Sequence, residues 1–235
     1  MTTIVAEHLT RQADLLPLRV LGLPITVIGA GAIGSFVTLG LAKMGFGNIM
    51  VYDFDTVDTV NLNSQFYRFK DVGQYKTYAL KEIVKDFSNV DISFSNSAWK
   101  GQPLGAGGII ISAADSMAVR RMIWEANPMA RAIIDSRMGA EYASLYTMKP
   151  HEKEDKEDYP ATLYTDEEAV QVPCTAKATV YTATLLAGLV CKSVKDLALG
   201  NPYNRIVHWD IAKNSMLNWQ AGIKEEVVME TQASL

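Results

Sequence analysis

The chain has 235 residues, of which 49% are hydrophobic and 20% are charged. This length and composition predict one large α/β domain or two small ones with a well-filled core, and they exclude a generally disordered chain. The 26 acidic and 22 basic residues give a formal net charge of −4, which offers no electrostatic basis for binding nucleic acid or an anionic membrane.

In chain order, residues 1–23 are predicted to form an N-terminal helical arm. A β-branched strand at 25–28 leads directly into a glycine-rich turn at 29–34. Residues 33–44 have helical spacing, and 49–52 form a second strand. Together these segments predict a βαβ unit with parallel strands and a right-handed crossover.

The remaining elements follow the same reasoning. We predict helices at 75–87, 116–126, 175–191 and 194–199, and strands at 91–95, 108–112, 131–134, 144–148, 206–211 and 215–219. The charged segment within residues 149–173 predicts a mobile crossover loop, either a lid or a merely solvated connection, and residues 225–235 predict a tail. The whole pattern predicts a single α/β domain, residues 1–235, with a Rossmann-like, doubly wound, mostly parallel sheet and antiparallel C-terminal strands.

Two cysteines, Cys174 and Cys191, form neither a zinc-type pair nor a disulfide framework. This usage is typical of a reducing compartment. The polar N-terminus does not resemble a signal peptide, and the apolar run at 179–191 is too short to span a bilayer. These features predict a soluble cytoplasmic protein.

The glycine-rich turn contains Gly29, Gly31 and Gly34 between a predicted strand and a predicted helix. Glycines at this place let the backbone approach a phosphate, whose charge is favoured at a helix N-terminus. Asp53 ends the second strand about 20 residues later, where an acidic residue binds ribose hydroxyls. Asp55 lies either on the same side as Asp53 or serves as a cap or solvated carboxylate. A nucleotide site is therefore predicted, without a choice between ATP and a redox dinucleotide.

Further motifs make the chain similar to the ThiF/MoeB/HesA family of E1-like adenylating enzymes. The turn is followed by Asp53-Phe54-Asp55, Asn61-Leu62-Asn63-Ser64-Gln65-Phe66 and Gly73-Gln74-Tyr75-Lys76, and Asp115 closes the fourth core strand. The resemblance extends over residues 8–220. Each motif alone is common, but the complete set in this order is specific to the family. It implies ATP and Mg²⁺ as cofactors. No zinc is expected, because the C-x-x-C pairs of zinc-binding members are missing.

The resemblance also implies roles for individual residues. The implied nucleotide-binding set is Gly29, Gly31, Ala32, Ile33, Gly34, Asp53, Asp55, Asn61, Ser64, Gln65, Lys76 and Asp115. Lys76 would bring its positive charge close to the phosphates, and Asp115 would hold Mg²⁺ through an oxygen ligand. Arg11 would reach the ATP of a neighbouring subunit, which implies a homodimer. Each residue also has a structural alternative: Lys76 as a solvated lysine, Asp115 as a helix N-cap and Arg11 as a surface charge.

Ser64 departs from the family, which usually has arginine at that position. A hydroxyl cannot replace the bidentate contact between a guanidinium and a phosphate. Either Arg68 or another residue compensates, or adenylation is slow or lost.

Cys174 stands before an apolar helix predicted to start at residue 175, and a helix N-terminus favours the thiolate. By resemblance it would accept an acyl group as a thioester; the alternative is a buried structural cysteine. Cys191 is expected in the core.

The predicted function is ATP-dependent adenylation of the C-terminal carboxylate of a small ubiquitin-like or sulfur-carrier protein, with possible transfer to Cys174. The catalytic residues would be Arg11, Lys76, Asp115 and Cys174. Two alternatives stay open: a NAD-dependent oxidoreductase on the same fold, and a non-catalytic E1-like scaffold, which Ser64 favours.

Overall fold

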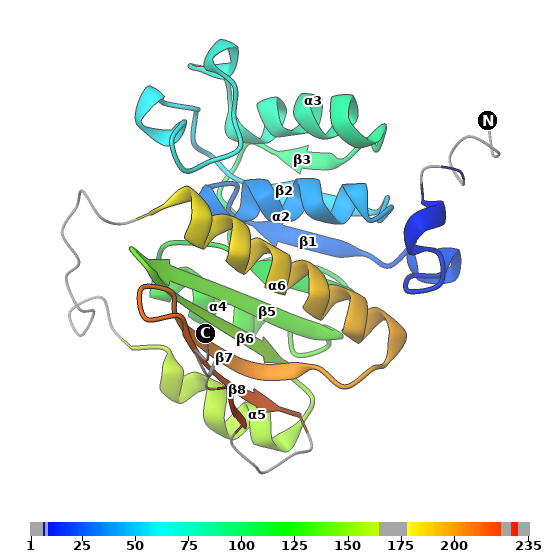
Figure 1. Cartoon of the computed structure of the whole chain (residues 1–235), viewed down its shortest axis with the longest axis vertical. Helices are drawn as coiled ribbons and strands as arrows, with labels where there is room; N and C mark the ends of the chain where they lie inside the picture. The colour runs from blue at the N-terminus through cyan, green and yellow to red at the C-terminus, as the bar shows by residue number, and fades with distance from the viewer. Residues whose placement is uncertain (1–6, 8, 165–177, 222–226, 230–235) are drawn as a thin grey trace, which may run out of the picture.

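The computed structural model describes residues 7, 9–164, 178–221 and 227–229. Their strands form one nine-stranded sheet in the order β3-β2-β1-β4-β5-β6-β7-β8-β9. The pairs from β3 to β5 are parallel, and those from β5 to β9 are antiparallel. The predicted fold class, with a parallel core and antiparallel C-terminal strands, is confirmed (Figure 1).

The elements have the following bounds. The strands are β1 (Ile25–Ile28), β2 (Ile49–Tyr52), β3 (Ser93–Ser95), β4 (Ile109–Ser112), β5 (Ala132–Gly139), β6 (Tyr142–Met148), β7 (Asn204–Asp210), β8 (Ser215–Gln220) and β9 (Val227–Met229). The α-helices are α2 (Ala32–Lys43), α3 (Lys76–Ser88), α4 (Met117–Ala126), α5 (Lys153–Asp158) and α6 (Val180–Leu199). Short 3₁₀ helices are η1 (Thr10–Gln12), η2 (Leu18–Val20), η3 (Thr59–Asn61), η4 (Phe69–Asp71) and η5 (Tyr159–Thr162).

Helices cover both faces of the parallel strands, so these strands are apolar on both sides. Val27 and Ile111 point to the larger core under α2, α3 and α6. Their neighbours Ile28 and Ile110 point to the opposite face, where Ile123 of α4 packs (Figure 1). This two-sided burial fixes the ends of β1 and β4, from which the candidate site is built.

The pair α2 and α6 packs closely in the larger core. A Cβ atom on Gly40 of α2 would lie only 2.8 Å from the Sγ of Cys191 on α6. Cys191 is buried, and this burial raises the pKa of its thiol to about 12. The prediction that Cys191 belongs to the core is confirmed.

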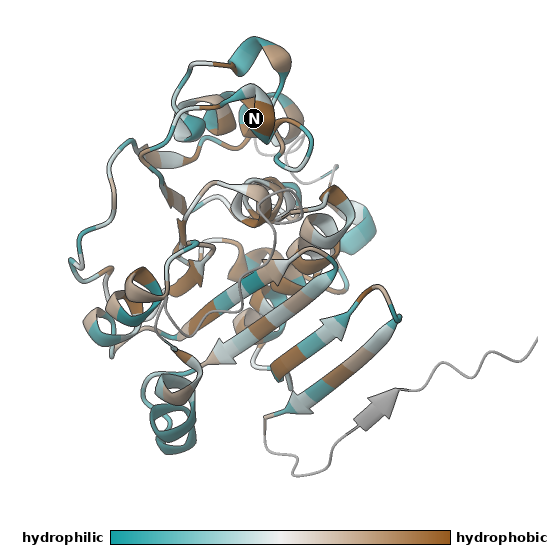
Figure 2. Cartoon of the chain, turned by 90° about the vertical axis from the view of Figure 1, so that its left-hand side faces the viewer, coloured by the Kyte–Doolittle hydropathy of each residue, from teal (hydrophilic) through white to brown (hydrophobic). Residues whose placement is uncertain are grey.

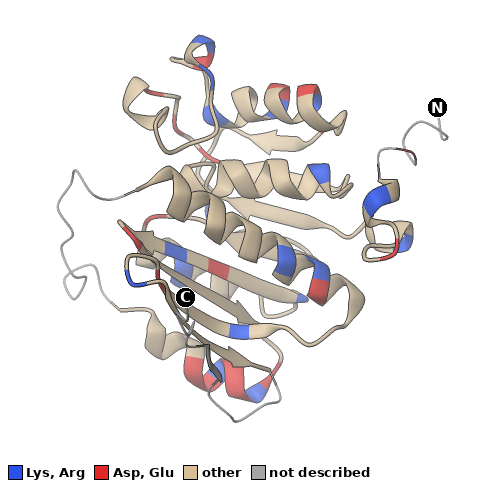
Figure 3. Cartoon of the chain, in the orientation of Figure 1, with Lys and Arg blue, Asp and Glu red and all other residues tan. Residues whose placement is uncertain are grey.

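The segment after β6 contains more helical structure than the loop predicted for residues 149–173. It contains α5 and η5, and Tyr159 is only 1% exposed, with its ring 4.7 Å from that of Trp124. Asp155 is also buried and accepts a hydrogen bond from Arg205 at 2.5 Å. α5 is charged (Figure 3) and hydrophilic (Figure 2), and this composition did not indicate that these two residues are buried. Residues 153–162 are therefore helical where a loop was predicted. The mobility of the crossover stays a prediction, and residues 165–173 lie outside the described part.

Three other boundaries differ from the prediction. The N-terminal arm contains the two short 3₁₀ helices η1 and η2, because Pro17 and Gly22 interrupt a longer helix. α6 runs as one helix from Val180, capped by Thr179, since no glycine or proline breaks it after residue 191. β9 pairs with β8 within the predicted tail. No helix in the described ranges is long and apolar enough to cross a membrane.

Candidate active site

The glycine-rich turn connects β1 to α2 at the point where the strand order reverses between β1 and β4. In open α/β sheets, ligands bind outside the carboxyl ends of the strands at such a switch point. Gly29 has a φ of +97°, which side chains rarely tolerate. A Cβ atom on Gly34 would lie 1.8 Å from the carbonyl oxygen of Gly29. Gly31, in contrast, has no atom within 4 Å of its Cβ position, so the turn is open on that side.

Asp53 follows β2, which pairs with β1, and its carboxylate therefore lies beside the turn. One oxygen accepts the N–H of Ala30 at 2.6 Å, and the other accepts the N–H of Asp55 at 2.8 Å. Burial raises the pKa of the Asp53 carboxyl, and these two hydrogen bonds only partly oppose that effect. The carboxylate expected to bind ribose is thus fixed against the turn.

Lys76 is the first residue of α3, and its side chain is only 7% exposed. Its ammonium nitrogen lies 2.8 Å from an Asp55 carboxylate oxygen. The Lys76 N–H also donates to the backbone carbonyl of Asp55 at 2.9 Å. The alternative of a solvated lysine is wrong, and the structure brings the predicted pair of carboxylates and the predicted lysine together.

The loop between Asp55 and Lys76 carries three further predicted residues. Asn61 is partly used as a cap, because its side-chain oxygen accepts the N–H of Asp58 at 3.0 Å. Ser64 is buried. The side-chain oxygen of Gln65 is also buried and has no hydrogen-bond partner among the described residues.

Arg68 does not take the place of the arginine missing at Ser64. Its guanidinium forms ion pairs with Asp71 at 3.0 Å and with Asp86 at 2.9 Å. The Arg68 guanidinium is thus held between Asp71 of the loop and Asp86 of α3. In this structure, compensation by Arg68 would require both ion pairs to break.

Asp115 lies just beyond β4 and is exposed. The same strand end touches the turn, since a Cβ on Gly29 would lie 2.6 Å from the carbonyl oxygen of Ala113. The N-cap of α4 is Ser116, so the alternative role of Asp115 as that cap is wrong. No cluster of three metal-binding side chains occurs in the described ranges. A single exposed carboxylate fits Mg²⁺, which takes its remaining ligands from water and phosphate.

The N-terminal arm, which carries Arg11 in η1, lies at the other end of β1 from the turn (Figure 1). Its neighbour Gln12 donates to the carbonyl of Met44, which follows the last residue of α2. The turn is at the first residue of that helix, roughly 18 Å away along its axis. Arg11 is exposed and does not join the turn of its own chain.

Cys174 lies outside the described residues. The helix that was predicted to begin at residue 175 begins at Val180. The predicted helix N-terminus directly after Cys174, with its effect on the pKa of that thiol, concerns residues outside the described part and stays a prediction.

A buried charge network beside the site was not predicted from the sequence. Asp135 on β5 is fully buried and pairs with both Arg120 and Arg137. Arg120 also donates to the carbonyl of Ala114, which fixes the turn before Asp115. Burial, together with nearby Arg137, lowers the pKa of Arg120 to about 10. The sequence contained one indication of this network: Arg120 lies in an amphipathic helix, five positions after Asp115.

Arg137 lies on β5, two residues after Asp135, and is fixed by three contacts. It lies 2.7 Å from Asp135 and donates to the carbonyl of Thr162 at 2.8 Å. Its guanidinium also stacks 4.3 Å from the centre of the Tyr146 ring. Arg137 therefore belongs to the buried ion-pair network around Asp135.

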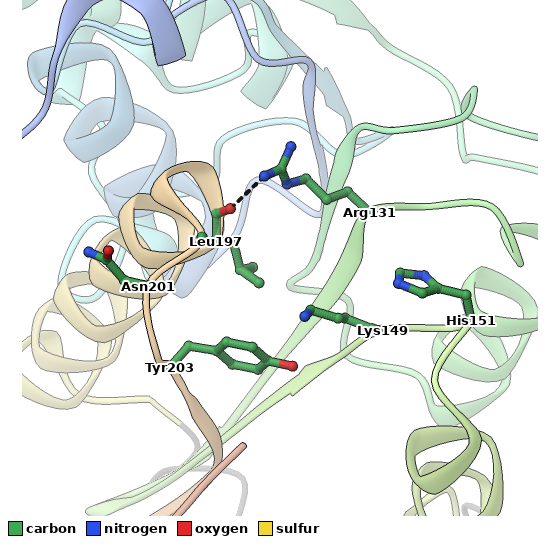
Figure 4. A pocket seen from close by; sticks show the side chains of 7 residues that line it. Arg131, Lys149, His151, Leu197, Asn201 and Tyr203 are labelled. Atoms are coloured by element: carbon green, nitrogen blue, oxygen red, sulfur yellow. Dashed lines mark hydrogen bonds between the residues drawn. The ribbon is translucent and has the colours of Figure 1, made fainter. Parts of the chain in front are cut away.

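A cavity of about 270 Å³ lies at the opposite end of the parallel strands (Figure 4). Its lining consists of Arg131, Lys149, His151, Leu197, Gly200, Asn201 and Tyr203. Arg131 donates to the carbonyl of Leu197 at 2.9 Å, and the Lys149 ammonium lies 5.0 Å from the centre of the Tyr203 ring. The cavity contains none of the predicted site residues, so it is separate from the candidate site.

Two proteins of known activity are similar in sequence to part of this chain. The chain is 33% identical to the SUMO-activating enzyme subunit uba-2 of Caenorhabditis elegans over 132 residues, 52% of this chain and 22% of that protein. It is 45% identical to the NEDD8-activating enzyme E1 catalytic subunit of Dictyostelium discoideum over 73 residues, 31% of this chain and 16% of that protein. The chain thus matches less than a quarter of the length of either relative.

Two solved structures have the same fold. PaaA superposes with a TM-score of 0.73 at 18% identity, over 98% of this chain and 76% of PaaA. Escherichia coli MccB with AMPCPP and MccA superposes with a TM-score of 0.64 at 16% identity, over 92% of this chain and 66% of MccB. The model of the ThiF family matches residues 10–226. Nearly the whole chain is matched, and the chain therefore belongs to the ThiF family.

Proposed function

We propose that the chain is an ATP-dependent adenylyltransferase that activates the C-terminal carboxylate of a small ubiquitin-like or sulfur-carrier protein. The observation that carries this proposal is the buried Lys76 ammonium, 2.8 Å from Asp55 and next to the Asp53-bound turn. A dinucleotide oxidoreductase has no need of a buried lysine at this place, whereas a triphosphate needs positive charge there.

In the proposed reaction, an oxygen of the acceptor carboxylate attacks the α-phosphorus of ATP. The bond from that phosphorus to the bridging oxygen breaks, and pyrophosphate leaves with the electron pair. Two anions must meet, so rate depends on positioning and on neutralised charge. Lys76 contributes the charge, Asp53 binds the ribose, and the N-terminus of α2 faces the phosphates. Asp115 would hold Mg²⁺, which supplies further charge neutralisation when bound.

The nature of the acceptor is also part of the proposal. The relatives named above activate SUMO and NEDD8, which supports a protein tail rather than a free metabolite. Because the chain spans a small part of those relatives, their full activities are not transferred to it. The two cysteines form no disulfide framework, as is typical of proteins in a reducing compartment, and this supports a cytoplasmic reaction.

Arg11 is proposed to act only in a homodimer, since it lies at the far end of α2 from its own turn. In that arrangement its guanidinium would contact the phosphates bound by the second subunit. A 1:1 mixture of Arg11→Ala and Lys76→Ala subunits tests this role. Half of the dimers that form at random contain both variants, and each of these has one complete site. The mixture should therefore recover about half of one active site per dimer on average, whereas either variant alone stays inactive. Equal activity of Arg11→Ala and the wild type would contradict it.

Cys174 is proposed as the acceptor of the acyl group after adenylation. Its thiolate would attack the acyl carbon, form a thioester and release AMP. Cys174→Ala should abolish a thiol-sensitive adduct of the carrier while pyrophosphate exchange continues; Cys191→Ala is the matched control. An adduct that survives in Cys174→Ala would contradict this role.

The test of the main reaction is ATP–pyrophosphate exchange in the presence of candidate carriers from the same gene neighbourhood. The same carrier with an amidated C-terminus is the matched control, because it offers no carboxylate. Exchange that needs the free carboxylate and is lost in Lys76→Ala supports the proposal. ATP binding without exchange for any carrier would favour the scaffold alternative, for which Ser64 is the specific observation.

A further inference from the structure

The peptide unit at Ala30 in the glycine-rich turn is held from two sides. The N–H of Ala30 donates to the Asp53 carboxylate at 2.6 Å. The carbonyl of Ala30 accepts a hydrogen bond from the hydroxyl of Tyr67, also at 2.6 Å. The sequence predicts that Asp53 binds ribose, and it gives no indication of the first contact. The second contact comes from the loop between Asp55 and Lys76 and was not predicted either.

Tyr67 is itself fixed to the helices that flank the turn. The preceding residue, Phe66, donates its N–H to the hydroxyl of Ser35 in the first turn of α2, at 3.0 Å. The Phe66 ring packs edge-on against Phe36 and Phe87, at 5.2 and 5.9 Å between ring centres. The loop that carries Tyr67 is thus docked on α2 and α3, and the hydroxyl position is determined by this packing.

The Tyr67 hydroxyl is a permanent donor in this environment. Burial, reinforced by the neighbouring carboxylates of Asp53, Asp71 and Asp55, raises the pKa of Tyr67 well above its ordinary value. The phenol therefore keeps its proton at neutral pH. It has one proton to donate, and the carbonyl of Ala30 accepts it.

The geometry of the peptide bond connects this contact to the direction of the Gly31 N–H. All peptide bonds are trans in the described ranges, and in a trans peptide the C=O and the following N–H point in opposite directions. A carbonyl of Ala30 directed at Tyr67 therefore directs the N–H of Gly31 away from Tyr67. Gly31 is the N-cap of α2, and the space at its Cβ position is empty to 4 Å.

We propose that Tyr67 is a positioning residue for nucleotide phosphates: its hydroxyl orients the Ala30–Gly31 peptide so that the Gly31 N–H is presented to them. This inference rests on the proposed function only in taking a nucleotide triphosphate as the ligand. A chain that has Ser64 in place of a guanidinium depends more strongly on such backbone donors.

The test is the Tyr67→Phe variant, which removes one hydroxyl and keeps the ring. Calorimetric titration gives Kd for MgATP and, separately, for adenosine, which has no phosphates. We expect Tyr67→Phe to weaken the affinity for MgATP by about tenfold and to leave the affinity for adenosine unchanged. The Tm should stay within about 3 °C of the wild type. The matched control is Tyr181→Phe, whose hydroxyl donates to Glu141 at an exposed position.

A second measurement observes the Gly31 N–H itself. In protein labelled with ¹⁵N-glycine, MgATP should shift the Gly31 amide resonance strongly in the wild type and weakly in Tyr67→Phe. An equal loss of adenosine and MgATP affinity, or an unchanged Gly31 shift, would overturn the positioning role while ATP binding by the wild type stands. Absence of MgATP binding by the wild type would overturn this inference together with the proposed function.

Discussion

The ammonium group of Lys76 lies 2.8 Å from the carboxylate of Asp55, at the first residue of α3. A positive charge is unfavourable at a helix N-terminus, and burial adds to this cost. The chain keeps the charge there and balances it with a half-exposed carboxylate, which a bound phosphate could supplement.

This arrangement predicts opposite effects of Lys76→Met on binding and on stability. MgATP affinity should fall by about tenfold or more, because a charge-assisted contact is lost. Tm should stay the same or rise, because an apolar side chain of similar length suits the buried site. Calorimetry and thermal unfolding measure the two effects. Lys81→Met on the same helix, where the ammonium lies 3.4 Å from Asp91, should change neither. Loss of stability with intact MgATP binding would show that Lys76 is structural.

Two glycines of the turn should respond differently to alanine. Gly34→Ala places a Cβ atom 1.8 Å from the backbone oxygen of Gly29, so the backbone must move, at a cost of about 3 kcal/mol of unfolding free energy. Gly31→Ala meets no atom within 4 Å and should change stability by less than about 1 kcal/mol. The methyl group would instead occupy the space for phosphate, so MgATP binding should be lost. Denaturant unfolding and titration separate the outcomes. Normal MgATP affinity in Gly31→Ala would exclude phosphate from this side.

Asp135→Asn should strongly destabilise the protein. Asp135 is fully buried between Arg120 and Arg137, and its neutralisation leaves two buried guanidinium groups without a counter-charge. The expected loss is about 3 kcal/mol of unfolding free energy. Asp210→Asn removes a carboxylate from an exposed pair with Lys213 and should leave stability almost unchanged. Urea unfolding of both variants measures the difference, and equal losses would refute the special role of the buried network.

His208 should make stability depend on pH near neutrality. Its imidazole is half-buried, with Nδ1 3.0 Å from the Ser144 hydroxyl, and burial together with Arg137 lowers its pKa below 6.5. Between the folded pKa and 6.5, the unfolded chain binds a proton that the folded chain does not. Stability therefore rises with pH across this window and falls as pH decreases through 6.5.

His208→Gln should flatten that dependence. Tm measured from pH 5.5 to 7.5 should vary less in the variant than in the wild type, while His151→Gln, at an exposed position, should leave the wild-type slope in place. An unchanged slope in His208→Gln would assign the dependence to other groups.

The parallel core was predictable because its signals are local. The strand β2 has the predicted bounds, and the turn at Gly29 has the conformation that its glycines predict. Asp53 and Asp115 lie near the turn because both follow parallel strands, whose carboxyl ends lie at one edge of the sheet. Lys76 follows a loop instead, and the hydrogen bond from its N–H to the Asp55 carbonyl fixes it there.

The parts that were not predicted depend on tertiary contacts. The charged sequence of α5 gave no sign that Tyr159 and Asp155 would be buried, since their partners Trp124 and Arg205 are remote in sequence. The contact of Tyr67 with Ala30 likewise depends on how a loop docks on α2. No periodicity in a single chain encodes such pairings.

The most direct test of the account is calorimetric titration of the wild-type protein with MgATP and, separately, with NAD, using Asp115→Ala and Lys76→Ala as variants. We predict micromolar binding of MgATP, weakened in both variants, and no binding of NAD. Binding of NAD without MgATP would contradict the adenylation site, and binding of neither would leave the protein as a scaffold.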